Sequence, residues 1–536
     1  MEIRMTGLIL CVVAAIYTIV WLYRKVTSPE WSIPGPWLAR FSRIWYFWHV
    51  RAGSFHHENI ELHRKYGPIV RVGPNLYSIA APDKEVYGIG SKFRKSDWYE
   101  GWKHPSPDKW ALFADQDIRR HAETRKRFQG LYSMSALLSY EKYVDDCTAI
   151  FDQRLTEFEK AGEQVDMAHW FQCYAFDVMG NLTYSERFGF LDRGDDIAGT
   201  IAALEKSGVY STLIGIYAWL HPFVYRVMEF LPNNGASGRT YLMNFVQQKI
   251  DAREKERTAE GTKPTTTTTT TTAKHIQQSQ LAPEQQEQTP RDFLDKLRDG
   301  HLENPQQVTR YHMFMMGLSN IIAGSDTTAV SLSSVLFHLL TNPGTLEKLR
   351  REIAEYRKSR TSVQEDGDAP TLPFKVTQDL PYLQAVIKEA LRMHPATGLP
   401  LWRVVPARGA TVLGHYFPAG AIVGVNSWVA HRNEEVFGND VGEFRPERWI
   451  EAKEGGDVER LKRMDAFYMP FGLGSRTCLG RHISTLEMSK LVPRLVEHYD
   501  FELAMDPADW RTVNYWFVRP ERFPVRVKRR ASVGAS

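Results

Sequence analysis

Cysteine is scarce in this chain of 536 residues, which has only Cys11, Cys147, Cys173 and Cys478. The four lie far apart and no two form a C-x-x-C pair, which argues against a disulfide scaffold and against a cysteine-rich zinc site. So low a count is typical of a reducing compartment such as the cytosol. Because a lone cysteine is usually a small buried hydrophobic side chain, any chemical role must come from the residues around it.

An excess of one charge is also missing. The formal net charge is only +4 and the chain has no concentrated basic tail, so composition makes no case for binding nucleic acid. Internal repeats are not visible. Apolar residues make up 43% of the chain and charged residues 24%, which is ordinary for a globular protein long enough to bury a large core.

Charge is absent altogether from residues 6–23, which read TGLILCVVAAIYTIVWLY. As a helix this stretch would extend about 27 Å, enough to cross a thin bilayer. We therefore expect residues 1–28 to be a membrane anchor. A cleavable signal peptide is the alternative, but the short apolar core and small-residue cleavage site that it needs are not obvious here. Arg24 and Lys25 follow the span directly, which predicts that the rest of the chain faces the cytoplasm.

Residues 29–536 are expected to form one catalytic domain, entered through a stiff hinge at Pro29 and Pro34-Gly35-Pro36. Within it, residues 258–290 combine a threonine run with a Gln-rich stretch and almost no apolar residues, which predicts a disordered loop. Helical patterns dominate, so we expect a mainly α fold with a small β portion. The expected helices are 114–130, 136–160, 165–185, 238–257, 303–341, 344–357 and 379–393, and the expected strands lie near 69–80, 411–424 and 423–428.

The strongest motif is FGLGSRTCLG, residues 471–480, which ends just before an apolar-periodic stretch. This order places Cys478 at a helix N-terminus, where free N–H groups and the helix dipole favour the thiolate that a metal needs. Arg476 is a fixed cation that could pair with a carboxylate of a bound ligand. Gly474 permits a tight turn, and Gly480 lets the backbone approach a flat ligand closely.

This ten-residue segment resembles the haem-binding loop of the cytochrome P-450 family, F-x-x-G-x-R-x-C-x-G, at every fixed position. The resemblance implies the cytochrome P-450 fold, haem b (iron protoporphyrin IX) as cofactor, Cys478 as the metal ligand and Arg476 as a contact of the haem. A thiolate ligand donates electron density to the iron and favours O–O cleavage.

A second motif is AGSDTT, residues 323–328, inside a long apolar helical stretch. Thr327 can bond back to the carbonyl of Ala323 and bend the helix, while Asp326 would be an expensive buried charge without a partner. Taken alone, the motif fits a bent core helix equally well. It resembles the distal helix of the same family, in which a glycine, here Gly324, opens an oxygen groove and an acid–alcohol pair relays protons. By that resemblance Asp326 and Thr327 are the catalytic pair.

A third pattern places Glu389 and Arg392 on one helix face, which alone is common on solvated helices. It resembles the E-x-x-R of the family, whose third member, an arginine in P-E-R-W, is Arg448 here. The role that this resemblance implies is structural, since the cluster locks the haem loop.

A basic helix, DIRRHAETRKRF, carries His121 and Arg125 four residues apart. A solvated basic face explains this pattern by itself. In the family, however, such a helix offers residues to the haem propionates, which implies cofactor binding by His121 and Arg125. Arg403, in LPLWRVVP, matches another propionate arginine. Charges on the outer face of the helix are expected to dock a reductase, namely Arg119, Arg120, Lys126 and Arg127.

These resemblances imply a monooxygenase that inserts one atom of O2 into an organic substrate. Electrons would come from NADPH through a membrane-bound flavoprotein reductase, with cytochrome b5 as an optional second donor. The expected location is the endoplasmic reticulum membrane, with a single span and a cytosolic catalytic domain. Two alternatives remain open: a haem-thiolate isomerase or dehydratase that needs no reductase, and a non-enzymatic haem protein. Both would be less dependent on Asp326 and Thr327.

The expected lid over the haem is residues 95–115, where Trp98, Tyr99, Trp102 and Trp110 suggest a bulky, largely apolar ligand. Two segments, GLPLWRVVP and CLGRHISTLEMSKLVPRLVEHYDFEL, resemble filamentous-fungal members of the pisatin-demethylase type. Many of those serve secondary metabolism, which suggests tailoring of a polycyclic natural product.

Overall fold

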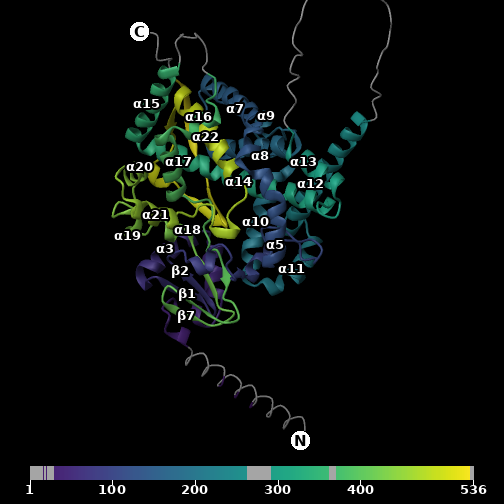
Figure 1. The fold of residues 1–536 in the computed structure, drawn as a ribbon, viewed down its shortest axis with the longest axis vertical. Coiled ribbons are helices and arrows are strands. Elements are labelled where there is room, and N and C mark those ends of the chain that lie inside the picture. Colours follow the sequence, from purple (N-terminus) through teal and green to yellow (C-terminus); the bar gives the residue numbers. More distant parts are fainter. Residues whose placement is uncertain are drawn as a thin grey trace, which may run out of the picture.

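The computed structural model describes residues 12, 16, 20, 29–261, 291–360 and 370–530 (Figure 1). Most of the predicted anchor therefore lies outside the described residues, as does the predicted loop from residue 262 onward; residues 258–261 continue a helix. Among the described helices, none combines the length and the apolar character that a membrane span requires. The mainly α architecture with small sheets is as predicted.

Long helices make up most of the domain. They are α7 (Glu141–Ala161), α8 (Met167–Tyr184), α10 (Thr200–Ile216), α12 (Gly235–Gly261), α13 (Phe293–Glu303), α14 (Arg310–Thr341), α15 (Pro343–Arg360), α17 (Pro381–Met393) and α22 (Arg481–His498). The shorter helices are α2 (Ile44–Arg51), α3 (Phe55–Tyr66), α4 (Lys84–Tyr87), α5 (Ile118–Phe128), α6 (Met134–Leu138), α9 (Phe190–Arg193), α11 (His221–Glu229), α16 (Phe374–Gln378), α18 (Ser427–Ala430), α19 (Glu434–Phe437), α20 (Glu447–Glu454) and α21 (Val458–Phe467).

Short 3₁₀ helices of three to six residues occur between these elements. They are η1 (Pro29–Ser32), η2 (Trp37–Arg40), η3 (Asp97–Trp102), η4 (Gln129–Tyr132), η5 (Ile197–Gly199), η6 (Ala218–Leu220), η7 (Gly474–Arg476) and η8 (Pro507–Asp509).

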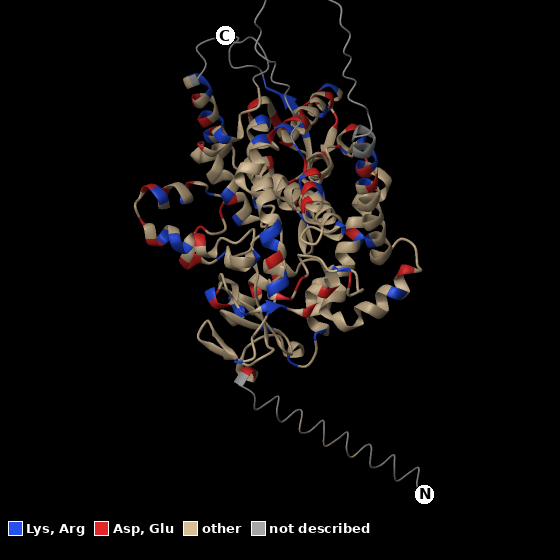
Figure 2. Ribbon diagram, turned by 45° about the vertical axis from the view of Figure 1, so that its right-hand side comes forward, with Lys and Arg blue, Asp and Glu red and all other residues tan. Residues whose placement is uncertain are grey.

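Helix α14 runs through the middle of the helical part and packs against α8, α17 and α22 (Figure 1). It begins with a capping box, in which the Thr309 side chain accepts from the backbone N–H of His312 and the His312 side chain bonds back to Thr309. Its apolar side chains join those of α7, α8, α17 and α22 in one large buried cluster. The central helices carry few charges, while charges of both signs are spread over the outer helices (Figure 2). Most of α14 is therefore buried.

The strands form small sheets. They are β1 (Ile69–Gly73), β2 (Leu76–Ile79), β3 (Arg94–Lys95), β4 (Gln164–Asp166), β5 (Arg403–Val404), β6 (Ala410–Val412), β7 (His415–Phe417), β8 (Ile422–Val425), β9 (Tyr499–Leu503), β10 (Thr512–Tyr515), β11 (Phe517–Pro520) and β12 (Pro524–Arg529). The largest sheet has the order β1-β2-β8-β5-β3, with β2 and β8 parallel and its other pairs antiparallel.

Two pairings position the functional site. Lys95 on β3 lies opposite Arg403 on β5, so two cations meet at one edge of the sheet. The hairpin β10–β11 turns at Trp516, a buried residue with φ of 83°, and β11 contacts α14. The end of the chain thereby reaches the central helix.

Two sequence expectations need correction, and some helices were not expected. The predicted helix 303–341 begins only at Arg310, because Glu303 ends α13, the chain leaves the helical conformation at Asn304-Pro305, and α14 starts at the Thr309 cap. The predicted strand 423–428 ends at Val425, where the side chain of Asn426 caps α18. Helix α10 was not expected, because its apolar residues do not follow a helical stripe and it carries Gly208 and Gly215.

Candidate functional site: a cysteine loop facing a polar distal helix

The loop around Cys478 is held by its own backbone. The N–H of Cys478 donates to the carbonyl of Phe471 at 2.8 Å, and the N–H of Thr477 donates to that of Gly474 at 3.1 Å. Gly474 has φ of +58°, and a Cβ there would lie 1.9 Å from the carbonyl oxygen of Tyr87. Any other residue would clash at this position, so the turn that leads to Cys478 and α22 requires glycine.

The thiol of Cys478 is accessible on one side and surrounded by protein on the other. Its side chain is exposed, yet the surrounding protein raises its pKa by desolvation, while backbone N–H groups of Gly480 and Arg481 act in the opposite direction. Both observations fit a sulfur at the wall of an internal hollow. A metal cation bound there would deprotonate it outright. Cys147 and Cys173 are buried instead, and burial raises the pKa of each thiol.

Cationic side chains gather beside this loop without enough anions to balance them. Arg476 donates through Nη1 to the carbonyl of Asp115 at 2.8 Å, but its buried Nη2 has no hydrogen-bond partner within the described residues. Burial and then the charge of Arg403 lower the pKa of Arg476 to about 10. Burial and then Arg476 lower the pKa of His121 to about 2, so this imidazole is a neutral hydrogen-bond donor or acceptor.

Lys95 belongs to the same cluster, although the sequence did not single it out. It is buried, and desolvation followed by the charges of Arg403 and Arg476 lowers its pKa well below the ordinary value. The carboxylate of Asp115, which could balance these charges, is engaged by Arg120 at 2.7 Å. Unbalanced buried cations need an anionic ligand. Two carboxylates of the haem-propionate type fit this need, and the unpaired Nη2 of Arg476 is the donor that would receive one.

Arg125 contacts the backbone of the cysteine loop directly. Its Nη1 donates to the carbonyl of Thr477 at 2.6 Å, and its charge is one of the influences that lower the pKa of Cys478. The structure therefore places Arg125 against the loop next to the sulfur. Arg403 donates to the carbonyl of Trp402 at 3.0 Å and to the hydroxyl of Tyr99 at 3.3 Å.

On α14, Asp326 and Thr327 point to different surroundings. Asp326 is buried and accepts from Nε2 of Gln172 on α8 at 2.5 Å. Desolvation raises its pKa, and Arg519 acts against this rise. Thr327 is half-buried, and its hydroxyl donates to the carbonyl of Ala323 at 2.7 Å, as predicted. A buried acid and a less buried hydroxyl are therefore adjacent on one turn of the helix.

Gly324 has a packing role that the resemblance did not suggest. A Cβ at this position would lie 2.6 Å from the sulfur of Met179 on α8. The missing side chain therefore lets α8 and α14 approach closely. This contact accounts for the glycine without an oxygen groove.

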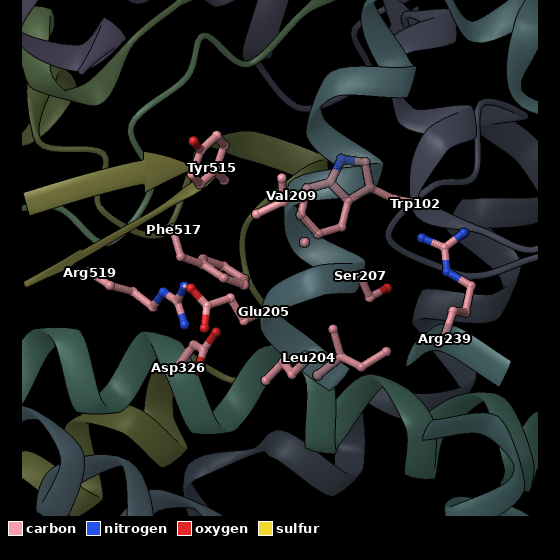
Figure 3. Close-up of a pocket in the computed structure, with 12 residues that line it drawn as sticks. Trp102, Leu204, Glu205, Ser207, Val209, Arg239, Asp326, Tyr515, Phe517 and Arg519 are labelled. Carbon is pink, nitrogen blue, oxygen red and sulfur yellow. The ribbon is translucent and has the colours of Figure 1, made fainter. Parts of the chain in front are cut away.

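A pocket lies beside this part of α14, between α10, η3 and the β10–β11 hairpin (Figure 3). Its walls combine apolar side chains with four charged ones. The apolar residues include Trp102, Leu204, Val209, Ile322, Tyr515 and Phe517, and the charged residues are Glu205, Arg239, Asp326 and Arg519. A pocket of this composition suits a mostly apolar small molecule.

The expected aromatic lid is only partly correct. Trp102 lines the pocket, but Trp98 and Tyr99 are buried in a core cluster with Trp402 and Trp516. Aromatic burial explains their sequence spacing as well as ligand contact would. Trp110 packs on Tyr311 and His312 of α14 and lies under the guanidinium of Arg120.

Glu389 and its two arginines form a fully buried cluster, as predicted. Its carboxylate accepts from Arg392 at 2.8 and 2.9 Å and from Arg448 at 2.8 Å. Burial alone would raise the pKa of Glu389, but the arginines lower it below its ordinary value. The carbonyl of Arg392 bonds His431, whose Nε2 accepts from the N–H of Met469 at 2.8 Å. The cluster thereby reaches the start of the Cys478 loop.

Comparison with known proteins agrees with this geometry. Residues 34–523 match the family described as Cytochrome P-450. The chain is 36% identical to a pisatin demethylase of Fusarium vanettenii over 520 residues, 96% of this chain and 94% of that protein. It is 36% identical to a cytochrome P-450 monooxygenase of Aspergillus terreus, over 87% of this chain and 89% of that one. It is 35% identical to the cytochrome P-450 monooxygenase pkfB of Emericella nidulans, over 96% and 94%.

Members of this family use haem, receive electrons from a redox partner and act on small molecules. The cysteine loop, the unbalanced cations beside it and the acid–alcohol pair on α14 agree with that chemistry. The chain therefore belongs to the cytochrome P-450 family and is a haem-dependent monooxygenase.

Proposed function

We propose that this monooxygenase oxidises a bulky, largely apolar aromatic compound of fungal secondary metabolism, with electrons from NADPH delivered by a flavoprotein reductase. The pocket beside Asp326 has an apolar wall that includes Trp102, Tyr515 and Phe517, but its volume of about 40 Å³ holds no bulky compound unless these side chains move apart. The observation that carries the proposal is the similarity to fungal monooxygenases, among them two pisatin demethylases, which supports a substrate of this class.

In this proposal each residue has a defined task. When bound, the haem supplies the activation of O2 for insertion of one oxygen atom into the substrate. Cys478 is the thiolate ligand, and Arg476, Arg403 and His121 hold the propionates. Thr327 offers a hydroxyl to a water or to the reacting oxygen, and Asp326 replaces the proton that is used. A positioned acid of this kind typically contributes about 10²- to 10⁴-fold.

The ligand assignment is tested by replacing Cys478 with alanine and recording the reduced, CO-bound absorption spectrum. We expect loss of the thiolate-type Soret band, whereas replacement of Cys11, Cys147 or Cys173 should leave it in place. A band that persists without Cys478 would refute the assignment.

The substrate class is tested with purified reductase, NADPH and a panel of methoxylated polycyclic aromatics that includes pisatin. We expect a substrate-induced shift of the Soret band and formation of an oxidised product. Thr327→Ala should still bind the compound and consume NADPH, but release more hydrogen peroxide and form less product. Product formation without NADPH or reductase would instead favour the isomerase or dehydratase alternative.

We further propose that the protein is anchored in the endoplasmic reticulum membrane by residues 6–23, with the catalytic domain in the cytosol. Exposed apolar side chains on two adjacent parts of the surface support a membrane contact. One part lies around α2 and the other follows α10. They lie side by side, since Arg43, directly before α2, donates to the carbonyl of Ile216, the last residue of α10, at 3.0 Å. These side chains are Trp37, Leu38, Ile44 and Trp48 on one part, and Trp219, Phe223, Val227, Phe230 and Leu231 on the other.

The anchor is tested by washing membranes with alkaline carbonate. The full chain should stay in the membrane fraction, and a chain that begins at residue 29 should bind more weakly and reversibly. Release of a chain cut near Tyr23 into the lumen would show a signal peptide instead.

Reductase docking is proposed for the exposed charges of α5, with cytochrome b5 as an optional second donor. His121 turns inward on this helix while Arg119, Arg120, Lys126 and Arg127 are exposed. Electrostatic docking weakens with salt. Reversal of the Lys126 and Arg127 charges should slow NADPH-driven turnover and spare peroxide-driven oxidation. Equal losses in both assays would mean a damaged fold or haem site.

A further inference from the structure

A buried arginine in the wall of the pocket has no acid to balance its charge. Arg239, near the start of α12, is 5% exposed and lines the pocket beside α14. Its Nη2 donates to the carbonyl of Gly101 at 2.8 Å and to the hydroxyl of Ser211 at 2.5 Å, and its Nη1 donates to the carbonyl of Lys103. All three acceptors are neutral, and no carboxylate in the described part of the chain pairs with Arg239.

The guanidinium of Arg239 also has donors to spare. An arginine side chain carries five N–H groups, and three are used by these bonds, which leaves two without an acceptor among the described residues. Burial lowers the pKa of Arg239, and the groups that act against this fall are the phenols of Tyr225 and Tyr210, not acids. Because a buried cation without an anion is costly, a bound anion would stabilise this end of the pocket.

The other charged groups of the pocket balance one another. Nη2 of Arg519 on β11 is 2.7 Å from Oε1 of Glu205 on α10, so this pair adds no net charge. Asp326 is buried, and burial raises its pKa, which disfavours its negative form. Figure 3 shows these three residues on one side of Ser207 and Arg239 on the other. The pocket is therefore positive at its Arg239 end.

We propose that the preferred substrate carries an anionic oxygen, a carboxylate or a phenolate, on an otherwise apolar aromatic body, and that Arg239 binds this oxygen. Bonds between a guanidinium and a carboxylate are charge-assisted and among the strongest hydrogen bonds. The aromatic body would lie against Trp102, Leu204, Val209 and Phe517, which line the same pocket and must move apart to admit it. The inference rests on the proposed function and deepens it, because it names the substrate class of that pocket.

A purely structural role is the alternative, since the bonds of Arg239 tie α12 to η3 and α10. Two replacements separate the roles. Arg239→Gln removes the charge, whereas Arg239→Lys keeps the charge but cannot reproduce the planar set of donors. The matched control is Arg519→Gln combined with Glu205→Gln, which removes the balanced ion pair and leaves the net charge of the pocket unchanged.

Binding is measured on the haem-loaded enzyme at pH 7 and fixed salt, by the shift of the Soret band and by the rise in unfolding temperature. The probes are benzoate, 2-naphthoate and anthracene-2-carboxylate, each beside its methyl ester. We expect the acids that fit to bind more tightly than their esters. Arg239→Gln should weaken binding of these acids by about 10- to 100-fold and leave the esters unchanged. Arg239→Lys and the double control should retain the preference for acids.

The inference is wrong if no acid binds more tightly than its ester, or if Arg239→Gln weakens acids and esters equally. A structural tie alone predicts the latter result, with stability lost in both Arg239→Gln and Arg239→Lys. Failure of the proposed function would look different. Acids bound through Arg239 but never oxidised with reductase and NADPH would refute the proposed function and leave the anion site, whereas oxidation of esters and acids alike would do the reverse.

Discussion

Replacement of Glu389 by glutamine tests how much the buried cluster contributes to the stability of the protein and of its haem-binding loop. Five N–H groups converge on the carboxylate: two of Arg392, Nε of Arg448, the indole N–H of Trp449 at 2.9 Å and the backbone N–H of Arg445 at 3.1 Å. A glutamine amide keeps one oxygen and turns the other position into a donor. At least two of the five N–H groups then lose their acceptor, and both arginines lose their counter-charge.

The cost can be estimated from burial. The side chains of Glu389, Arg392 and Arg448 are all 0% exposed, so water cannot replace the lost acceptor. Breaking a buried ion pair by removing one partner costs about 3–5 kcal/mol, which is a large part of the 5–15 kcal/mol that is typical for a whole protein. Because the carbonyl of Arg392 holds His431, and His431 holds Met469, the loop with Cys478 should loosen as well.

Urea unfolding at pH 7 and the haem content of the purified protein measure these effects. The control is Glu459→Gln, which breaks a pair with Lys462 at the same three-residue spacing, but with side chains 79% and 66% exposed. Such a pair contributes about 0–1 kcal/mol. If Glu389→Gln unfolds within about 1 kcal/mol of the wild type and keeps its haem, the reasoning from burial is wrong.

Three further changes test other parts of the structure. The carboxylate of Glu487 is buried, and burial raises its pKa well above the ordinary value although the side chain of Thr328 acts against this rise; stability should therefore fall as pH rises from about 4.5, and Glu487→Gln should remove this dependence in urea unfolding measured from pH 5 to 8. Gly474→Ala forces a Cβ against the carbonyl of Tyr87, so the purified protein should contain little haem, and normal loading would contradict the assigned loop conformation. The side chain of Asp117 caps α5, so Asp117→Ala should lower the unfolding free energy by about 1 kcal/mol, whereas Asp117→Asn should retain most of it.

The parts of the site that could be predicted from the sequence are those built from local spacing. Residues 471–480 form the turn before α22, and Thr327 bonds back four residues because helix geometry places Ala323 there. The pairing of Glu389 with Arg392 likewise needs only one helical turn.

Contacts between distant segments were not predictable in this way. Lys95 joins the cations at the loop only because β3 pairs with β5. The residues around Lys95 do not reveal which strand β3 pairs with, or in which register. The ion pair of Glu205 with Arg519 needs α10 and the last hairpin to meet at α14. Trp98 and Tyr99 suggested a ligand, because an aromatic residue in a loop looks the same in sequence whether it faces a substrate or Trp402.

The hairpin that turns at Trp516 also has a consequence for biosynthesis. Phe517 and Arg519, which close one side of the pocket, come from the last residues of the chain, and the strand that follows, β12, pairs with β4 at residues 164–166. A ribosome adds about 5–20 residues per second, so the cysteine loop and α22 are synthesised seconds before this wall exists. Until these last strands are synthesised, the pocket beside α14 has no wall on this side. Premature termination after α22 would leave the cysteine loop in the chain but no enclosed pocket, and a nascent or truncated protein of this kind would expose α14 to solvent.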